Sequence, residues 1–97
     1  MYFIQGEATK AFKIGISISP EERLCQLQSY SPDVLNIIAV IGPMDWFHAR
    51  DRETQLHRKF THLRMHGEWF SCGDEIIDYI KDSPWVVEQQ NAVGARR

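Results

Sequence analysis

The start of the chain has a hydrophobic pattern typical of two short strands. Tyr2–Gln5 is aromatic and β-branched, a composition that strands favour. After the polar stretch 6–10, which predicts a turn, the segment 11–16 alternates between two faces. One face carries Phe12, Ile14 and Ile16, and the other carries Ala11, Lys13 and Gly15. The two segments therefore predict an antiparallel hairpin.

A helix is predicted next, over residues 19–29. Ser19 can cap its first turn, Pro20 suits the first helical position, and Glu22 can complete a capping box with Ser19. Helical spacing then places Leu24 and Leu27 on one face. This face is expected to be buried against the sheet.

A third strand and the longest helix follow. The apolar run 34–41 predicts a buried strand, which Gly42-Pro43 ends. The helix is expected over residues 45–63. Five apolar residues recur there at helical spacing and should face the core: Trp46, Ala49, Leu56, Phe60 and Leu63.

The last segments are shorter. Gly67 ends the long helix, and Glu68–Phe70 predicts a short strand or a packed loop. A final helix should begin at Ser71 or Gly73 and end near Lys81. Its apolar positions are Ile76, Ile77 and Ile80.

The order of predicted elements is β-β-α-β-α-(β)-α. Such an order predicts an α/β protein of the α+β kind, in which helices flank a small three-stranded antiparallel sheet. We expect one domain over residues 1–82. The C-terminal extension 83–97 is expected to be partly helical, with Pro84 at the start of a turn or helix, or disordered.

Composition agrees with a single folded domain. The chain has 97 residues, of which 43% are hydrophobic and 25% are charged, enough for one core. Its longest apolar run is far shorter than the roughly 20 residues that span a bilayer, and Met1–Gln5 lacks the features of a signal peptide. We therefore expect a cytoplasmic protein with no membrane contact, in which Cys25 and Cys72 are free, buried thiols.

The charge is negative overall but uneven. A net charge of −2 and a pI near 6.0 argue against strong non-specific binding of nucleic acid. Between His48 and His66, however, cations outnumber anions. These cations are Arg50, Arg52, Arg58, Lys59 and Arg64. The window predicts either a local phosphate-binding face or a solvated helix face.

Glu53 occupies a helical position where an apolar residue is expected. Ala49, Leu56 and Phe60 lie at helical spacing from it. A carboxylate on this core stripe is costly unless it is paired with a cation. Glu53 is therefore either one half of a buried ion pair or a metal ligand.

Arg23, Tyr2 and Lys13 each have two interpretations. The guanidinium of Arg23 matches the oxygens of a phosphate, although a surface pair with Glu22 or Gln26 is the more common role of a helical arginine. Tyr2 and Lys13 lie on neighbouring predicted strands, where the lysine can lower the pKa of the phenol and make it a general base. The alternative is a packed aromatic ring and a lysine that protects a sheet edge.

His57 follows Glu53 by one helical turn, on the same side of the helix. It can bind a metal ion, donate a proton, contact phosphate, or only hydrogen bond within the fold. The spacing differs from the zinc signature, which needs two histidines around a glutamate. No ligand spacing links the other candidates for a structural zinc site: His62, His66, Cys25 and Cys72.

Taken in order, these residues resemble the GIY-YIG nuclease domain. Tyr2-Phe-Ile, Lys13-Ile-Gly15 and Arg23, eight residues after that glycine, are similar to its start. The segments 53–60 and Gly67-Glu-Trp-Phe70 resemble the branch of many phage and bacterial proteins, in which KIG replaces YIG. The resemblance covers residues 2–82, and the predicted order of strands and helices agrees with the family fold.

The resemblance implies a catalytic role for five residues. Tyr2 would activate the attacking water, and Lys13 would stabilise the phenolate form of Tyr2. Arg23 would hold the scissile phosphate, and Glu53 would bind one divalent ion, Mg²⁺ or Mn²⁺. His57 would belong to the same site.

The resemblance also implies a nucleic-acid partner, with DNA as the expected substrate. Contacts to it are expected from six cations: Lys13, Arg23, Arg50, Arg58, Lys59 and Arg64. A homodimer or a protein partner would supply specificity to so small a domain.

Two functions remain open at this point. The first is a metal-dependent endonuclease that hydrolyses phosphodiester bonds, in a phage, mobile-element or defence setting. The second is a module of the same fold, weak or inactive in catalysis, that binds nucleic acid or a protein partner. The acidic total charge and Leu27, which replaces a histidine of the family, favour the second. A direct pair between Glu53 and Arg23 would favour it further.

Overall fold

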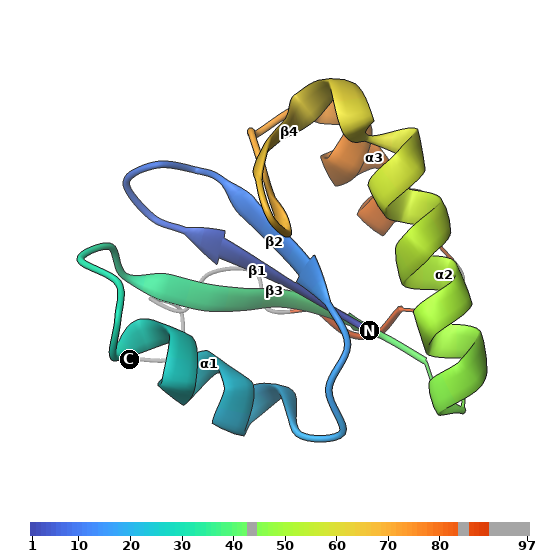
Figure 1. Cartoon of the computed structure of the whole chain (residues 1–97), viewed down its shortest axis with the longest axis horizontal. Coiled ribbons are helices and arrows are strands. Elements are labelled where there is room, and N and C mark those ends of the chain that lie inside the picture. Colours follow the sequence, from blue (N-terminus) through green and yellow to red (C-terminus); the bar gives the residue numbers. More distant parts are fainter. Residues whose placement is uncertain (43–44, 84–85, 90–97) are drawn as a thin grey trace.

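The computed structural model describes residues 1–42, 45–83 and 86–89 of the chain (Figure 1). Its strands are β1 (Tyr2–Gly6), β2 (Phe12–Gly15), β3 (Leu35–Ile41), β4 (Arg64–His66), β5 (Trp69–Phe70) and β6 (Val86–Gln89). Its helices are α1 (Pro20–Gln28), α2 (Trp46–Lys59) and α3 (Asp74–Asp82). As far as α3 the order is β-β-α-β-α-β-β-α, which confirms the predicted α+β class.

The strands form one antiparallel sheet in the order β4-β5-β2-β1-β3-β6. The predicted hairpin is present, with Tyr2 opposite Gly15 and Ile4 opposite Lys13. The sheet is nevertheless larger than the three strands expected. β5 joins the free edge of β2 through two residue pairs, and β4 pairs with β5. β6 joins β3 on the other side.

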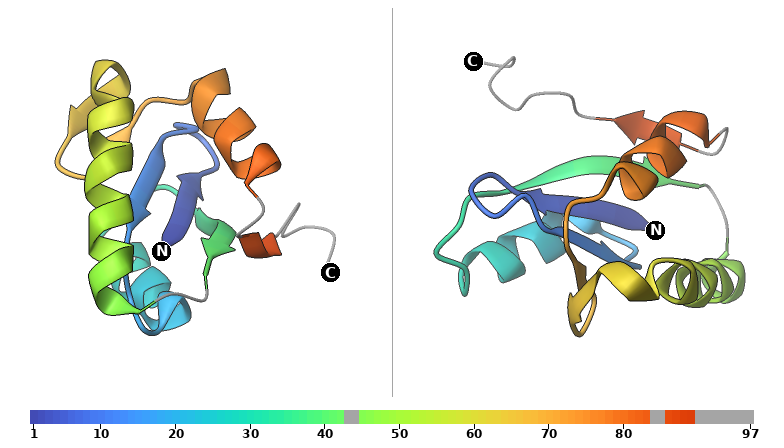
Figure 2. Two further views of the ribbon diagram at one scale, coloured as in Figure 1. Left: turned by 90° about the vertical axis from the view of Figure 1, so that its right-hand side faces the viewer. Right: turned by 90° about the horizontal axis from the view of Figure 1, so that it is seen from above.

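Helices cover both faces of the sheet. On one face, Phe3 and Ile14 belong to the larger core cluster, together with Leu56 of α2 and Ile76 of α3. On the other face, a smaller cluster around Tyr2 packs against α1. The core clusters therefore place α1 on one face and α2 with α3 on the other (Figures 1 and 2).

Helix α2 begins as predicted but ends earlier. The side chain of Asp45 accepts a hydrogen bond from the backbone N–H of His48 and caps the first turn. The helix ends at Lys59, and a 3₁₀ turn at Thr61–Leu63 follows. Trp46 was predicted to face the core, but it is 50% exposed. It is the first residue of α2, and the buried stripe of the helix begins only at Ala49.

Two other expectations at the level of single residues are wrong, and a third is confirmed only in part. Ser19 makes no capping hydrogen bond with its side chain, because its backbone angles do not direct the hydroxyl at the helix. Leu24 and Leu27 do pack against the smaller core, as expected, but they are partly rather than fully buried. Cys25 and Cys72 are free but exposed, since neither lies on the packed face of its segment.

The C-terminal segments follow the sequence in part. Glu68–Phe70 contains the predicted short strand, as β5, and α3 begins after Gly73. Residues 86–89 of the expected extension form β6 rather than a helix. Pro84 and the positions 90–97 lie outside the described residues.

Candidate metal and phosphate site

The candidate site lies at the edge of β2, just before the start of β5. β5 pairs with β2 only at Phe12 and Lys13. One residue further along β2, the backbone N–H of Ile14 donates to the carbonyl oxygen of Glu68 at 3.2 Å. The carbonyl oxygen of Ile14 accepts a hydrogen bond from Nε2 of His57 at 3.0 Å. α2 and the β4–β5 turn are thus both held against the same short stretch of strand edge.

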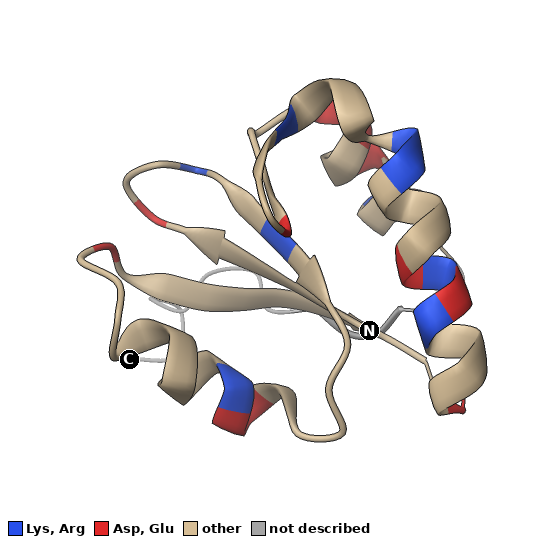
Figure 3. Cartoon of the chain, in the orientation of Figure 1, with Lys and Arg blue, Asp and Glu red and all other residues tan. Residues whose placement is uncertain are grey.

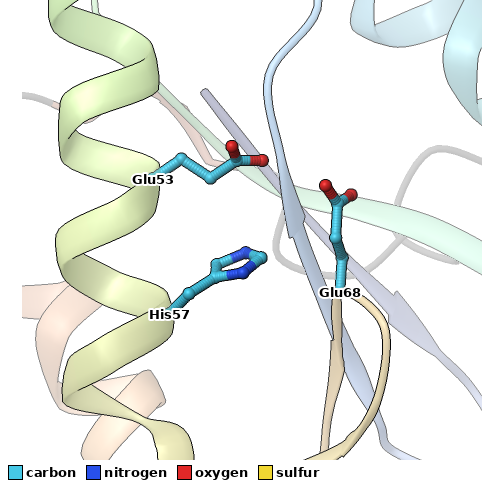
Figure 4. Close-up of side chains that lie close together, drawn as sticks. All are labelled: Glu53, His57 and Glu68. Atoms are coloured by element: carbon cyan, nitrogen blue, oxygen red, sulfur yellow. The ribbon is translucent and has the colours of Figure 1, made fainter.

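Three potential metal ligands meet at this edge: Glu53, His57 and Glu68. Their ligand atoms all lie within 4.8 Å of one another. Figure 4 shows Glu53 and His57 projecting from α2 toward Glu68, which comes from the turn before β5. A magnesium ion bonds oxygen at about 2.1 Å, which places its ligands about 3 to 4 Å apart. Small side-chain rotations would bring the three groups to such separations.

The hydrogen bond of His57 fixes which ring nitrogen is free. Because the partner of Nε2 is a carbonyl oxygen, Nε2 carries the proton and donates it. Nδ1 is therefore the nitrogen that can offer a lone pair to a metal ion when the ring is neutral. The ring also packs edge-on against Phe70, with 5.0 Å between the centroids. His57 is therefore oriented by the fold in the tautomer that can bind a cation.

The two carboxylates repel each other, and the site partly compensates for this. Burial, followed by the negative charge of Glu68, raises the pKa of Glu53 above its usual value. His57 and Lys13 act in the opposite direction. Lys13 is almost completely buried, and its Nζ lies 2.7 Å from Oε1 of Glu68. One lysine facing two carboxylates leaves net negative charge, so the donor set fits a divalent, oxygen-seeking cation.

Tyr2 borders the cluster and lies against Gly15. Its side chain is only 1% exposed. A Cβ atom added at Gly15 would lie 2.5 Å from the Tyr2 hydroxyl and 3.3 Å from Oε1 of Glu68. Real Cβ atoms do not approach other atoms as closely as the first of these distances. The glycine therefore makes room for the phenol, and the phenol lies beside the Glu68 carboxylate.

Arg23 reaches the same phenol from α1. Burial is the largest effect on Tyr2 and raises its pKa, whereas a hydrogen bond and the positive charge of Arg23 lower it. The charges of Glu68 and Glu53 add to the increase. Arg23 itself is exposed, and its Nη1 donates to Oε1 of Gln26 at 3.0 Å. Its guanidinium thus has the predicted surface pair and also lies at the opening of the site.

The remaining predicted cations are dispersed. Arg50 is exposed on α2, three residues before Glu53, whereas the exposed Arg58 projects from another side of the helix. Lys59 lies over the ring of Tyr79, 5.7 Å from its centroid, and Arg64 donates to the carbonyl oxygen of Gly67. Figure 3 shows basic and acidic residues alternating in the first half of α2, and basic residues alone near its end. Only Arg50 of these four lies on the same side of α2 as the cluster.

A hollow of about 480 Å³ opens between α2 and α3, on a different side of α2. Its lining carries both signs of charge, including Arg52, Lys59, Asp78 and Asp82. Arg52 donates to the hydroxyl of Tyr79 at 3.1 Å across this hollow. The mixed charge makes it a poor phosphate site compared with the cluster at the β2 edge.

The sequence did not single out Glu68 as a functional residue. It belongs to the Gly67-Glu-Trp-Phe70 segment, which drew attention only as a motif. Its carboxylate reaches the cluster because Gly67, with φ at +55°, turns the chain back between β4 and β5. The zinc candidates His62, His66, Cys25 and Cys72 form no comparable cluster in the part of the chain that is described.

The raised pKa of Glu53 predicts how pH affects the metal-free protein. The folded state binds the Glu53 proton more tightly than the unfolded state, whose carboxyl titrates near 4.5. The free energy of unfolding should therefore fall as pH rises from about 4.5 to the raised pKa of Glu53 in the folded protein. Without metal, Glu53→Gln should match the wild type in Tm below that pH range and exceed it above. Thermal melts in EDTA from pH 4 to 8 test this.

Comparing Glu53→Gln with the wild type separates the effect of Glu53 on stability from the effects of other acidic residues. Asp33 and Asp45 have lowered pKa values, because backbone N–H groups donate to them, and their contribution to stability is lost as pH falls. Both proteins carry these residues, so the effect cancels. If Tm changes with pH in the same way for the wild type and Glu53→Gln over the whole range, the pKa of Glu53 is not raised in the folded protein.

The fold and the site define a small α+β domain with two carboxylates and an imidazole at an open sheet edge. The chain belongs to the T5orf172 domain family, whose family model matches residues 1–84. No curated protein and no solved structure matches the chain. Among the described residues, no helix has the length and apolar character needed to cross a membrane.

Proposed function

We propose that this T5orf172 domain is a metal-dependent endonuclease of the GIY-YIG type, with DNA as its expected substrate. The observation that supports this most strongly is the meeting of Glu53, His57 and Glu68 beside Tyr2. Glu53 and Glu68 are partly buried, and carboxylates that repel one another in such a position are costly unless a cation or a reaction uses them. Glu53 has no ion pair with Arg23 among the described residues, so its carboxylate is available to a metal ion.

Glu53 and Glu68 would hold the metal ion, with Nδ1 of His57 as a third ligand. Mg²⁺ fits this mainly oxygen donor set, and Mn²⁺ fits the imidazole as well. When bound, the ion supplies positive charge that stabilises the leaving oxygen of the phosphodiester. Lys13 acts as a positioning residue here, because its ion pair at 2.7 Å fixes the Glu68 carboxylate.

Tyr2 and Arg23 would act on the nucleophile and the phosphate. After the Tyr2 phenol has lost its own proton to solvent, its phenolate accepts the proton of the attacking water and becomes a phenol again. The neighbouring charge of Arg23 favours the phenolate that this step needs. The exposed guanidinium of Arg23 also binds the scissile phosphate, whose oxygens match its donors. Arg23 would thus stabilise negative charge both on the Tyr2 phenolate and on the phosphate.

A pair of tyrosine variants tests the proposal. Tyr2→Phe removes only the hydroxyl, and we expect it to lower Mg²⁺-dependent cleavage of supercoiled plasmid by about 100-fold. Tyr79→Phe is the matched control, because its hydroxyl accepts a hydrogen bond from Arg52 on the α3 side of α2. This variant should cut at the wild-type rate.

The same assay separates true activity from contamination. EDTA should stop cleavage, and Mn²⁺ should restore it. Equal cutting by the wild type and Tyr2→Phe would show that the nuclease in the sample is a different protein. No cutting by the wild type with either metal, on plasmid, single strands or RNA, would reject the proposal.

A second function is supported by a different observation. The net charge is −2, and Asp51 and Glu53 lie between the cations in the first half of α2, so the helix does not present an uninterrupted basic surface (Figure 3). A binding module without catalysis fits this surface. Saturable binding of an oligonucleotide or a protein partner, with intact substrate after prolonged incubation in Mg²⁺ or Mn²⁺, would favour this function.

A further inference from the structure

Two large aromatic side chains are exposed at the start of α2. Trp46 is 50% exposed and Phe47 is 78% exposed. A large aromatic ring that faces water is not buried against another apolar surface, and a binding partner could cover it. Neither residue has a role in the mechanism proposed above, but the position of Trp46 relative to the cluster indicates one.

Helix geometry aligns Trp46 with the candidate metal site. Trp46 precedes Glu53 by seven residues on the same helix. Seven residues make about two turns, so the two side chains project within about 20° of each other and about 10 Å apart along the axis. Arg50 and His57 lie on this side as well. One side of α2 therefore presents an aromatic ring, a guanidinium, a carboxylate and an imidazole in that order.

Phe47 does not share this alignment. One residue along a helix turns the side-chain direction by about 100°, so Phe47 projects away from the side that carries Glu53. Its ring packs edge-on against His48, with 5.9 Å between the centroids. The two neighbouring aromatic residues are thus a matched pair, of which only Trp46 lies in line with the cluster.

We propose that Trp46 stacks on an unpaired base close to the phosphate bound at the cluster. The substrate is accordingly a nucleic acid with a single-stranded segment rather than a continuous duplex. This inference rests on the proposed function. A separation of about 10 Å corresponds to about three base steps at 3.4 Å each, or to fewer nucleotides of a stretched strand.

The charge of the protein supports a single strand over a duplex. Binding to duplex DNA rests mainly on many contacts between cations and phosphates. Of the six predicted cations, Lys13 is buried against Glu68, and Arg58 and Lys59 project away from the cluster. Three of the six, Arg23, Arg50 and Arg64, remain exposed near it, and Nε of Arg64 already donates to the carbonyl oxygen of Gly67. Base stacking on an aromatic ring supplies affinity without further cations, and in a duplex the base faces are already covered by their neighbours.

The test measures binding separately from cleavage. Full-length protein is titrated into a fluorescein-labelled single strand and a blunt hairpin duplex in Ca²⁺, a hard cation that oxygen ligands bind, and gels check that both probes stay intact. Trp46→Ala should weaken binding of the single strand by about 10-fold and change duplex binding by less than about 2-fold. Phe47→Ala should change neither. Trp46→Phe, which keeps a ring, should retain most of the affinity.

Each outcome decides for or against the stacking role. If single-strand binding depends on Trp46 but no metal supports cleavage, the stacking role stands and the nuclease proposal fails. If cleavage occurs and Trp46→Ala binds single strands like the wild type, the nuclease proposal stands and the stacking role is overturned. Equal losses in Trp46→Ala and Phe47→Ala, or a changed elution volume of both in gel filtration, would also overturn it. Such results would instead indicate a protein contact at this surface.

Discussion

Glu53→Gln is expected to lower metal-dependent cleavage by about 1,000-fold, the loss expected when an essential electrostatic interaction with the transition state is removed. Glutamine keeps the size of the side chain but removes the charge that draws a cation to the cluster of Glu53, His57 and Glu68. The same change should abolish the increase in Tm that Mg²⁺ gives the wild type. Cleavage is measured as initial rates on plasmid, and binding as Tm against metal concentration.

Glu75→Gln serves as the control for this variant. Glu75 lies on α3, away from the cluster, and pairs with the exposed His62. It should cut and bind metal like the wild type. Because removing the Glu53 charge relieves repulsion from Glu68, Glu53→Gln should fold at least as stably without metal. A Glu53→Gln protein that still gains stability with Mg²⁺ would place the ion elsewhere.

Gly15→Ala is expected to damage both the fold and the site. The added Cβ would lie 2.5 Å from the hydroxyl and 2.7 Å from Cζ of Tyr2. Tyr2 is 1% exposed and cannot swing into solvent. Overpacking of this kind costs about 1–3 kcal/mol, which lowers Tm by about 10 °C in a domain of this size. Displacing the phenol and Glu68 should reduce cleavage by about 100-fold or more.

Gly73→Ala tests whether any added methyl group has this effect. Its Cβ would approach Leu63, with Cδ1 at 2.9 Å, but that atom is the end of a flexible side chain that can move. Because Gly73 is also the N-cap of α3, where alanine is less favourable than glycine, we expect wild-type activity and a smaller decrease in Tm than in Gly15→Ala. If Gly15→Ala melts and cleaves like Gly73→Ala, Tyr2 is not fixed against the backbone of β2, and its proposed position at the reaction is wrong.

The main elements of the fold could be predicted because their signals are local. The alternation around Phe12 and Ile14, and the helical spacing of Ala49, Leu56 and Phe60, correspond to buried faces in the structure. The strands β4 and β6, which were not predicted, have three and four residues, and β5, predicted only as a short strand or a packed loop, has two. Such short segments carry no periodic signal, and they become strands only by pairing with distant parts of the chain.

In the candidate site, too, local spacing predicted some residues, and distant pairing brought in the others. Glu53 and His57 share one side of a helix, so their spacing alone placed them together. Glu68 was missed because its partner Lys13 is 55 positions away, and only the docking of the β4–β5 turn joins them. Trp46 was assigned to the core because helical spacing shows on which side of a helix a residue lies. It does not show whether the core extends as far as the first turn, and Trp46 is 50% exposed.

The β4–β5 hairpin has a consequence for how tightly the domain can hold an ion. β5 has two residues, β4 is exposed along its whole length, and Glu68 lies in the turn that joins them. Ion affinity and closure of this hairpin are therefore thermodynamically linked, since a cation shared by Glu53 and Glu68 also clamps the hairpin to the sheet. Gly67 supplies no ligand atom, yet the turn it allows helps to set that affinity.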